Sequence, residues 1–363
     1  MTKKSPFEQG KTVYLDSKIV FLSDGNLSKI SESFLYKHFA SRNPPYSMVG
    51  VNDLNQDDLD LSSRRVILIY KQLKASIKAL MRSNRSDTIV VWLDFMGLLT
   101  YLFSRLLFCR RRILVLNLMI PAGTKSIFSV LRRFLYRMML QDVNVFSTVN
   151  NIALVGYYKD VLKMNHFHRV FTLEDTILES AKEISGWSAG DGSVFFGGAA
   201  GRNHDLAIQI ATLLPNIQFT FVVKKKQFNS SKELPQNVTV FRDIPIEEFE
   251  YHLSRSSVMI LPISTHTPAG ILTLITAALK CRPVVSQNTL SLRPYINSGE
   301  TGVLLDSSDA SSWATEINIL LEDESKRHVM SEALQRSIVK RCSVERYCSE
   351  LDSIINIVSA GNK

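Results

Sequence analysis

The sequence predicts an α/β protein made of two domains, each built on a parallel sheet. Its 363 residues exceed one ordinary domain and suit two of similar size. Short apolar, β-branched runs alternate with amphipathic stretches of helical length, which is typical of parallel strands joined by crossover helices. Hydrophobic residues make up 45% of the chain and charged residues 21%, which excludes an intrinsically disordered chain.

The first half contains four expected strands, at residues 18–22, 66–70, 88–93 and 112–120. Helices are expected at 28–40 and 96–108. Polar turn residues follow two of the strands: Asp24, Gly25 and Asn26 come after the first, and Asp94 comes after the third. Asp94 directly precedes an apolar helix, so a helix-capping role is one interpretation of it.

The second half alternates more regularly. Strands are expected at 193–196, 218–223, 238–241, 258–262 and 283–286, and helices at 205–214, 246–254 and 271–279. Residues 181–192 are small, polar and glycine-rich, which suits a linker between the domains. The last segment, 343–358, is amphipathic, and Leu351, Ile354, Ile355 and Val358 line one face of the predicted helix.

The net charge of +9 is distributed unevenly. Residues 1–180 carry 25 Lys and Arg against 15 Asp and Glu, whereas residues 181–363 carry 18 against 19. Such an asymmetry indicates that the first domain faces an anionic partner, with nucleic acid and anionic lipid as candidates. No recognised nucleic-acid motif accompanies the charge, so nucleic acid is not expected as a partner.

Residues 126–140 (SIFSVLRRFLYRMML) combine Arg132, Arg133 and Arg137 with Phe128 and Phe134. This pattern predicts a helix that lies in a membrane interface, although a core helix with a solvated basic edge gives the same pattern. The longest apolar stretch, residues 95–108, is shorter than the roughly 20 residues that a spanning helix needs. No signal peptide is expected, and the four cysteines are far apart and show no metal-ligand pairing. A chain of this size does not need a disulfide scaffold, which favours a reducing compartment.

The segment 195–205 (FFGGAAGRNHD) places a glycine loop between a strand and a helix. Glycines such as Gly198 and Gly201 allow positive φ and close backbone approach, and a helix N-terminus attracts phosphate. Arg202 would add a bidentate phosphate contact. The alternative is a tight turn whose glycines serve only packing.

A second loop, 265–270 (THTPAG), lies between the strand 258–262 and the helix 271–279. Ligands bind open α/β sheets outside the carboxyl ends of the strands, so the two loops can face one crevice. The alternatives are a surface position for His266 and, for Thr276, a hydrogen bond to its own helix backbone.

Taken in order, these pieces resemble the retaining glycosyltransferases of family 4, of bacterial type, over most of residues 190–345. Segment 198–205 is similar to the loop that holds the donor phosphates, and segment 238–262 to the part that holds the nucleotide base. Segment 266–285 resembles a variant of the main family motif, and 298–305 (SGETGVLL) the element that follows it. The resemblance implies the GT-B fold, two Rossmann-like domains facing a central cleft. It implies an acceptor-binding domain at 1–180, a nucleotide-sugar domain at 181–345, and a C-terminal helix at 346–363 that crosses back to the first domain.

The resemblance also implies the site residues. It gives catalytic roles to Asp94, Arg202 and His266. The donor contacts are expected from Gly198, Gly201, Arg202, Arg242, Ala269, Gly270, Thr273 and Thr276. A loop near the donor and acceptor is expected at Asp24, Gly25 and Asn26. One departure stands out. The family has two glutamates separated by seven residues, and this chain has Pro268 and Thr276 in their places.

The expected function is transfer of a sugar, with retention, from a nucleotide-sugar donor to a lipid-linked or polysaccharide acceptor in surface glycan synthesis. Neither a metal nor a cofactor is expected. The protein is expected in the cytoplasm, peripheral on the anionic inner face of the cell membrane. Loss of the glutamate pair leaves a second hypothesis open, a catalytically degenerate binding or scaffold subunit.

Overall fold

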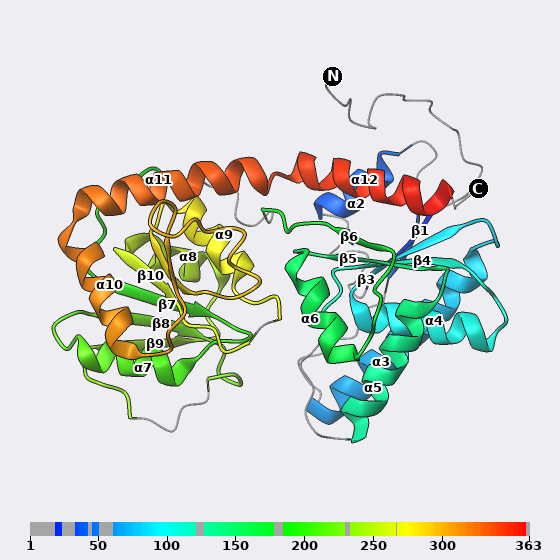
Figure 1. Ribbon diagram of the computed structural model, residues 1–363, viewed down its shortest axis with the longest axis horizontal. Helices are drawn as coiled ribbons and strands as arrows, with labels where there is room; N and C mark the ends of the chain where they lie inside the picture. The colour runs from blue at the N-terminus through cyan, green and yellow to red at the C-terminus, as the bar shows by residue number, and fades with distance from the viewer. Residues whose placement is uncertain are drawn as a thin grey trace.

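The computed structural model describes residues 19–23, 33–42, 46–50, 61–120, 127–177, 184–228, 233–265 and 267–360. Asp24, Gly25, Asn26 and His266 therefore lie outside the described residues. The described chain forms two α/β domains that lie side by side, with a pair of long C-terminal helices running along one edge of both (Figure 1).

The first domain is a six-stranded parallel sheet of order β2-β1-β3-β4-β5-β6. Its strands are β1 (Ile19–Ser23), β2 (Ser47–Gly50), β3 (Thr88–Trp92), β4 (Arg112–Leu116), β5 (Val145–Val149) and β6 (Val170–Thr172). Its helices are α2 (Phe34–Ala40), α3 (Leu61–Arg82), α4 (Asp94–Leu106), α5 (Ile127–Gln141) and α6 (Ala153–Leu162). Helices cover both faces of the sheet, so the central strands are apolar throughout rather than alternating.

One predicted strand is wrong: residues 66–70 lie inside the 22-residue helix α3. The apolar run is only five residues long, and the helix-forming segment KQLKASIKALMR follows it. Val66 and Tyr70 are exposed on this helix, whereas the central strands of the first sheet are buried.

The second domain is also a six-stranded parallel sheet, of order β12-β11-β10-β7-β8-β9. Its strands are β7 (Val194–Gly198), β8 (Phe219–Val223), β9 (Val238–Arg242), β10 (Val258–Leu261), β11 (Val284–Gln287) and β12 (Val303–Leu305). Its helices are α7 (His204–Leu213), α8 (Ile246–Arg255), α9 (Ile271–Leu279), α10 (Ala310–Glu322) and α11 (Glu324–Arg341). The predicted α/β class, with two parallel sheets, is confirmed.

The last helix, α12 (Val344–Ala360), leaves the second domain and packs on the first (Figure 1). Its buried residues Leu351, Ile355 and Val358 join Phe21 and Leu114 in one apolar cluster on the sheet. The stripe of apolar residues along this helix therefore covers one face of the first sheet together with α2, whose Leu35 and Phe39 belong to the same cluster.

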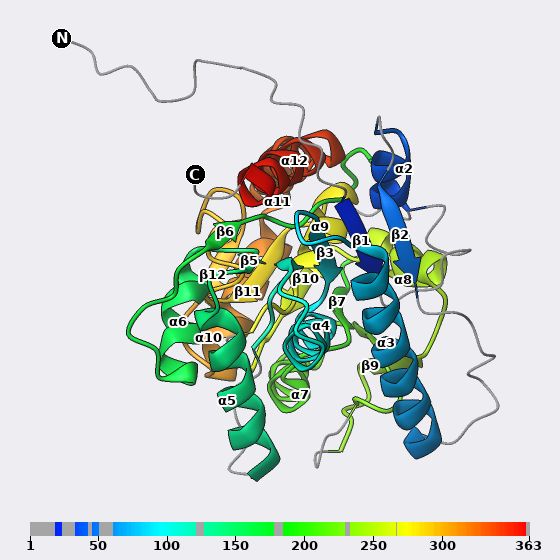
Figure 2. The same cartoon turned by 90° about the vertical axis from the view of Figure 1, so that its right-hand side faces the viewer.

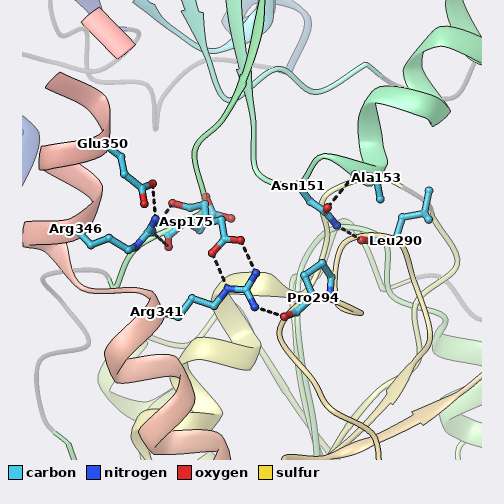
Figure 3. A network of polar contacts seen from close by, with 9 residues as sticks. Asn151, Ala153, Asp175, Leu290, Pro294, Arg341, Arg346 and Glu350 are labelled. Carbon is cyan, nitrogen blue, oxygen red and sulfur yellow. Dashed lines mark hydrogen bonds and ion pairs between the residues drawn. The ribbon is translucent and has the colours of Figure 1, made fainter. Parts of the chain in front are cut away.

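Polar contacts hold the domains together where the chain crosses between them (Figure 3). Arg341 of α11 forms an ion pair with both carboxylate oxygens of Glu174, its Nε lying 2.6 Å from Oε2. Arg346 of α12 donates to the backbone oxygens of Glu174 at 3.1 Å and Asp175 at 3.4 Å. On the other side of the junction, the Asn151 amide donates to the backbone oxygen of Leu290.

Candidate donor-binding site

A cavity of about 300 Å³ opens at the carboxyl ends of β7, β8 and β9, beside the first turns of α9. Most of its walls are apolar. We call it the donor cavity, and its principal lining residues are Gly198, Val223, Asp243, Ile244, Phe249, Leu272, Thr273 and Thr276. A mostly apolar cavity with a few polar groups is typical of a small-molecule site at this position in an open α/β sheet.

The glycine loop forms one wall of the donor cavity. Gly198 has φ of 112° and Gly201 has φ of 72°, which side chains rarely adopt. The loop is tied to the segment after β10, because Ser264 N donates to Gly201 O at 2.9 Å and Asn203 N to Pro262 O at 2.9 Å. Asn203 then caps α7 by accepting from Leu206 N at 3.1 Å. The N-terminus of α7 is thus held next to the cavity.

Arg202 lies buried behind the glycine loop. Its Nε donates to Gly197 O at 2.7 Å, Nη1 to Ala200 O at 3.0 Å and Nη2 to Thr273 Oγ1 at 2.8 Å. Burial lowers the pKa of Arg202 to about 10, so the group stays charged at neutral pH. Within the described residues no carboxylate forms an ion pair with it. Arg202 does not itself line the cavity, but it bonds to Thr273, which does. Because a buried charge is costly unless it is paired, an anionic ligand next to it would supply the missing partner.

The threonines of α9 sit at the cavity in different ways. Thr273 lines it and accepts from Arg202, which links α9 to the glycine loop. Thr276 also lines it, but its hydroxyl donates to Leu272 O at 2.9 Å, as the backbone-bonded interpretation predicts. Ala269 packs against the glycine loop, because a Cβ added to Gly201 would lie 2.9 Å from the Cβ of Ala269. Gly270, with φ of 86°, is the N-cap residue of α9.

Arg242 is turned away from the donor cavity. Its guanidinium lies over the ring of Phe228, 5.5 Å from the centroid, and Arg242 is not among the residues lining the cavity.

Asp94 belongs to the first domain and does not line the donor cavity. It is the first residue of α4, following Leu93, whose φ of 73° and ψ of 149° are strained for a residue with a side chain. The Tyr136 hydroxyl of α5 donates to Asp94 Oδ2. Burial raises the pKa of Asp94, and the Tyr136 hydrogen bond partly offsets that rise.

Comparison with known proteins relates this geometry to a family. Residues 182–337 match the family of glycosyl transferases, group 1. The match covers the second sheet with α7 to α10 and most of α11, so it contains the whole donor cavity. No curated protein matches the chain by sequence.

Solved structures with the same fold are only distantly related in sequence. Sucrose-phosphate synthase from Thermosynechococcus elongatus superposes with a TM-score of 0.69 at 12% identity, over 95% of this chain and all of that one. HepE from Anabaena, solved with UDP-glucose, gives 0.68 at 13% identity, over 93% of this chain and 99% of HepE. TarM of S. aureus gives 0.61 at 13% identity over 80% of this chain, which spans 60% of TarM's length. These likenesses confirm the predicted GT-B fold.

Several residues that line the donor cavity were not predicted from sequence, among them Asp243, Ile244 and Phe249. Asp243 Oδ1 accepts from Lys225 N at 3.3 Å, which joins the loops after β8 and β9. The available signal was positional, because Asp243 and Ile244 directly follow the carboxyl end of β9.

Gly198→Ala is expected to abolish nucleotide binding by this domain. A Cβ at position 198 would stand 2.2 Å from Nη2 of Arg202, so the guanidinium must move. The matched control is Gly192→Ala, where φ is also positive, at 80°, but no atom lies within 4 Å of the added Cβ. Isothermal titration with UDP should show loss of binding in the first variant only; equal affinity in both would mean that the glycine loop is a packing turn.

Proposed function

We propose that this protein transfers a sugar, with retention, from a nucleotide-sugar donor to a lipid-linked or polysaccharide acceptor in surface glycan synthesis. The observation that carries the proposal is the buried charge of Arg202, which no described carboxylate pairs, beside an apolar cavity at the carboxyl ends of β7–β9. The family match of this domain supports glycosyl transfer. The UDP-glucose bound to HepE supports UDP-sugars as the first donors to test.

In this proposal each part of the site has one role. The apolar walls at Ile244 and Phe249 hold the base, and the glycine loop and the N-terminus of α7 receive the diphosphate. Arg202 stabilises the negative charge that develops on the departing nucleotide diphosphate. Asp94, held by Tyr136, belongs to the first domain, to which the acceptor binds in this proposal.

A degenerate binding or scaffold subunit is the second candidate. It is favoured by Thr276, whose hydroxyl is already bonded to the helix backbone and which carries no charge for a ribose hydroxyl.

The two candidates separate in one experiment, a thermal-shift screen of nucleotides and nucleotide sugars followed by turnover assays with the ligands that bind. A donor at a hundred times its dissociation constant stabilises the protein by about 2.7 kcal/mol. Binding with turnover supports the enzyme, and binding without turnover on any lipid-linked or glycan acceptor supports the scaffold. If no nucleotide or nucleotide sugar binds, both candidates fail.

We propose further that the first domain rests on the anionic inner face of the membrane. Helix α5 exposes Phe128, Leu131 and Phe134 while Tyr136 faces the core, and Arg132 and Arg137 lie on its exposed side. Helix α3, which exposes Val66 and Tyr70, projects from the same side of the domain (Figures 1 and 2). Among the described residues no helix is long and apolar enough to cross a bilayer. Basic and aromatic side chains on projecting helices support peripheral binding.

A further inference from the structure

A second cavity, of about 330 Å³, lies between the domains at the carboxyl ends of the first sheet. We call it the junction cavity. Its walls are mostly apolar and include the aromatic side chains of Phe34, Trp92 and Tyr347. Leu272 of α9 lines both this cavity and the donor cavity, so the two adjoin.

Two polar side chains in the junction cavity, those of Asp175 and Asn117, each have an oxygen to which no described residue donates. Asp175 is half-buried; its Oδ2 accepts from the Asn150 amide at 2.8 Å, and no described residue donates to its Oδ1. Asn117 is held by its backbone N–H, which donates to Thr148 Oγ1 at 2.9 Å, while its buried Oδ1 has no hydrogen-bond partner. Buried polar atoms are normally hydrogen-bonded, so the Asn117 oxygen calls for a donor, and the second carboxylate oxygen of Asp175 is free to accept from one.

The charge of the cavity restricts what can bind. Asp175 is the one charged residue among the described lining residues, so a phosphate would meet a carboxylate and no cation. A purely apolar tail would leave the Asn117 oxygen without a donor and would desolvate the Asp175 carboxylate, whose only described side-chain donor is Asn150. A neutral sugar ring satisfies both demands, because its C–H faces pack on aromatic rings and its hydroxyls donate to the two oxygens.

We propose that the junction cavity receives an uncharged sugar ring of the acceptor, with Asp175 and Asn117 as its hydrogen-bonding partners. The proposal rests on the glycosyl transfer proposed above. It assigns the phosphate and lipid portions of a lipid-linked acceptor to positions outside this cavity.

The charge state of Asp175 gives the site a signature. Burial and the neighbouring Glu174 raise the pKa of Asp175 to about 6, against the opposing effects of the Asn150 hydrogen bond and of Arg346 on α12. Tyr295, Tyr347 and Cys342 also lie near it, and burial raises the pKa of each far above neutral, so all three stay uncharged. A sugar hydroxyl binds the carboxylate more strongly than the acid, so affinity should fall as the pH drops through about 6.

The test uses fluorine NMR of the full chain labelled with 5-fluorotryptophan, because Trp92 lines the cavity and the other two tryptophans, Trp187 and Trp313, do not. The probes are neutral methyl glycosides of glucose, mannose and N-acetylglucosamine, then glycerol phosphate and decanol. We expect at least one glycoside to shift the Trp92 signal, assigned with Trp92→Phe, and to leave that of Trp313 unchanged. No donor is added, so the result does not depend on nucleotide binding or turnover.

Asp175→Asn should weaken glycoside binding about fivefold, since a hydrogen bond to a charged group is stronger than one to a neutral group, and should remove the pH dependence. Asp160→Asn is the control, because Asp160 is an exposed carboxylate of the first domain that does not line the cavity. A shift of Trp92 by glycerol phosphate or decanol alone overturns the proposal, as does equal weakening in both variants or no glycoside binding up to the solubility limit. If the protein binds UDP-glucose but no glycoside, this inference is wrong while the proposed glycosyl transfer stands.

Discussion

Arg202→Ala is expected to weaken nucleotide-sugar binding by roughly ten- to a hundredfold, because a hydrogen bond to a charged group contributes about 1.5–3 kcal/mol. The variant also removes the charge that no described carboxylate pairs. Arg202→Lys keeps a positive charge but loses the planar fork, so its affinity should be intermediate. The measurement is isothermal titration with UDP-glucose and with UDP.

The matched control is Arg282→Ala in the same domain. Arg282 is also buried and donates three hydrogen bonds, to Lys280 O at 2.9 Å, Ser256 O at 2.8 Å and Ser188 Oγ at 2.9 Å, but none of these partners lines the donor cavity, whereas Arg202 bonds to the lining residue Thr273. Both variants should lose stability, and only Arg202→Ala should lose affinity. Unchanged affinity in Arg202→Ala, or an equal loss in Arg282→Ala, would limit Arg202 to a packing role.

Replacing Arg132, Arg133 and Arg137 together by Gln is expected to reduce binding to anionic vesicles roughly a hundredfold. Each basic residue near an anionic leaflet contributes about 1 kcal/mol, and the three lie on one exposed helix. Added salt should weaken the wild-type interaction, because it screens charges at the surface. Sedimentation with vesicles of varied anionic lipid content measures the effect.

A second set of variants separates charge from insertion. The control variant changes three exposed lysines of the second domain to Gln: Lys225, Lys226 and, on α11, Lys340. Phe128→Ser combined with Phe134→Ser should lower the part of the binding that resists salt. Equal binding by wild type and the α5 arginine triple, or no binding at any anionic lipid content, would rule out this surface.

Local sequence determined the elements whose pattern is unambiguous. Strands such as β3 and β10 are continuous β-branched or apolar runs bounded by turn residues, and burial on both faces of a parallel sheet requires that composition. Gly198 and Gly201 could also be identified locally, because a strand that turns at once into a helix needs positive φ at the turn. The apolar run 66–70 misled because its three β-branched residues, Val66, Ile67 and Ile69, cannot outweigh the helix formers that follow them.

Only the tertiary structure decided what the polar side chains contact. Arg202 and Arg242 look equivalent as strand-end cations in the sequence, yet one is buried beside the donor cavity and the other stacks on Phe228. Asp175 carried no sequence signal, because its neighbours Asn150 and Arg346 come from segments 25 and 171 residues away that meet only when the domains assemble. Backbone preferences act over a few residues and can be read locally, whereas burial and pairing of a charge depend on contacts that chain folding alone brings together.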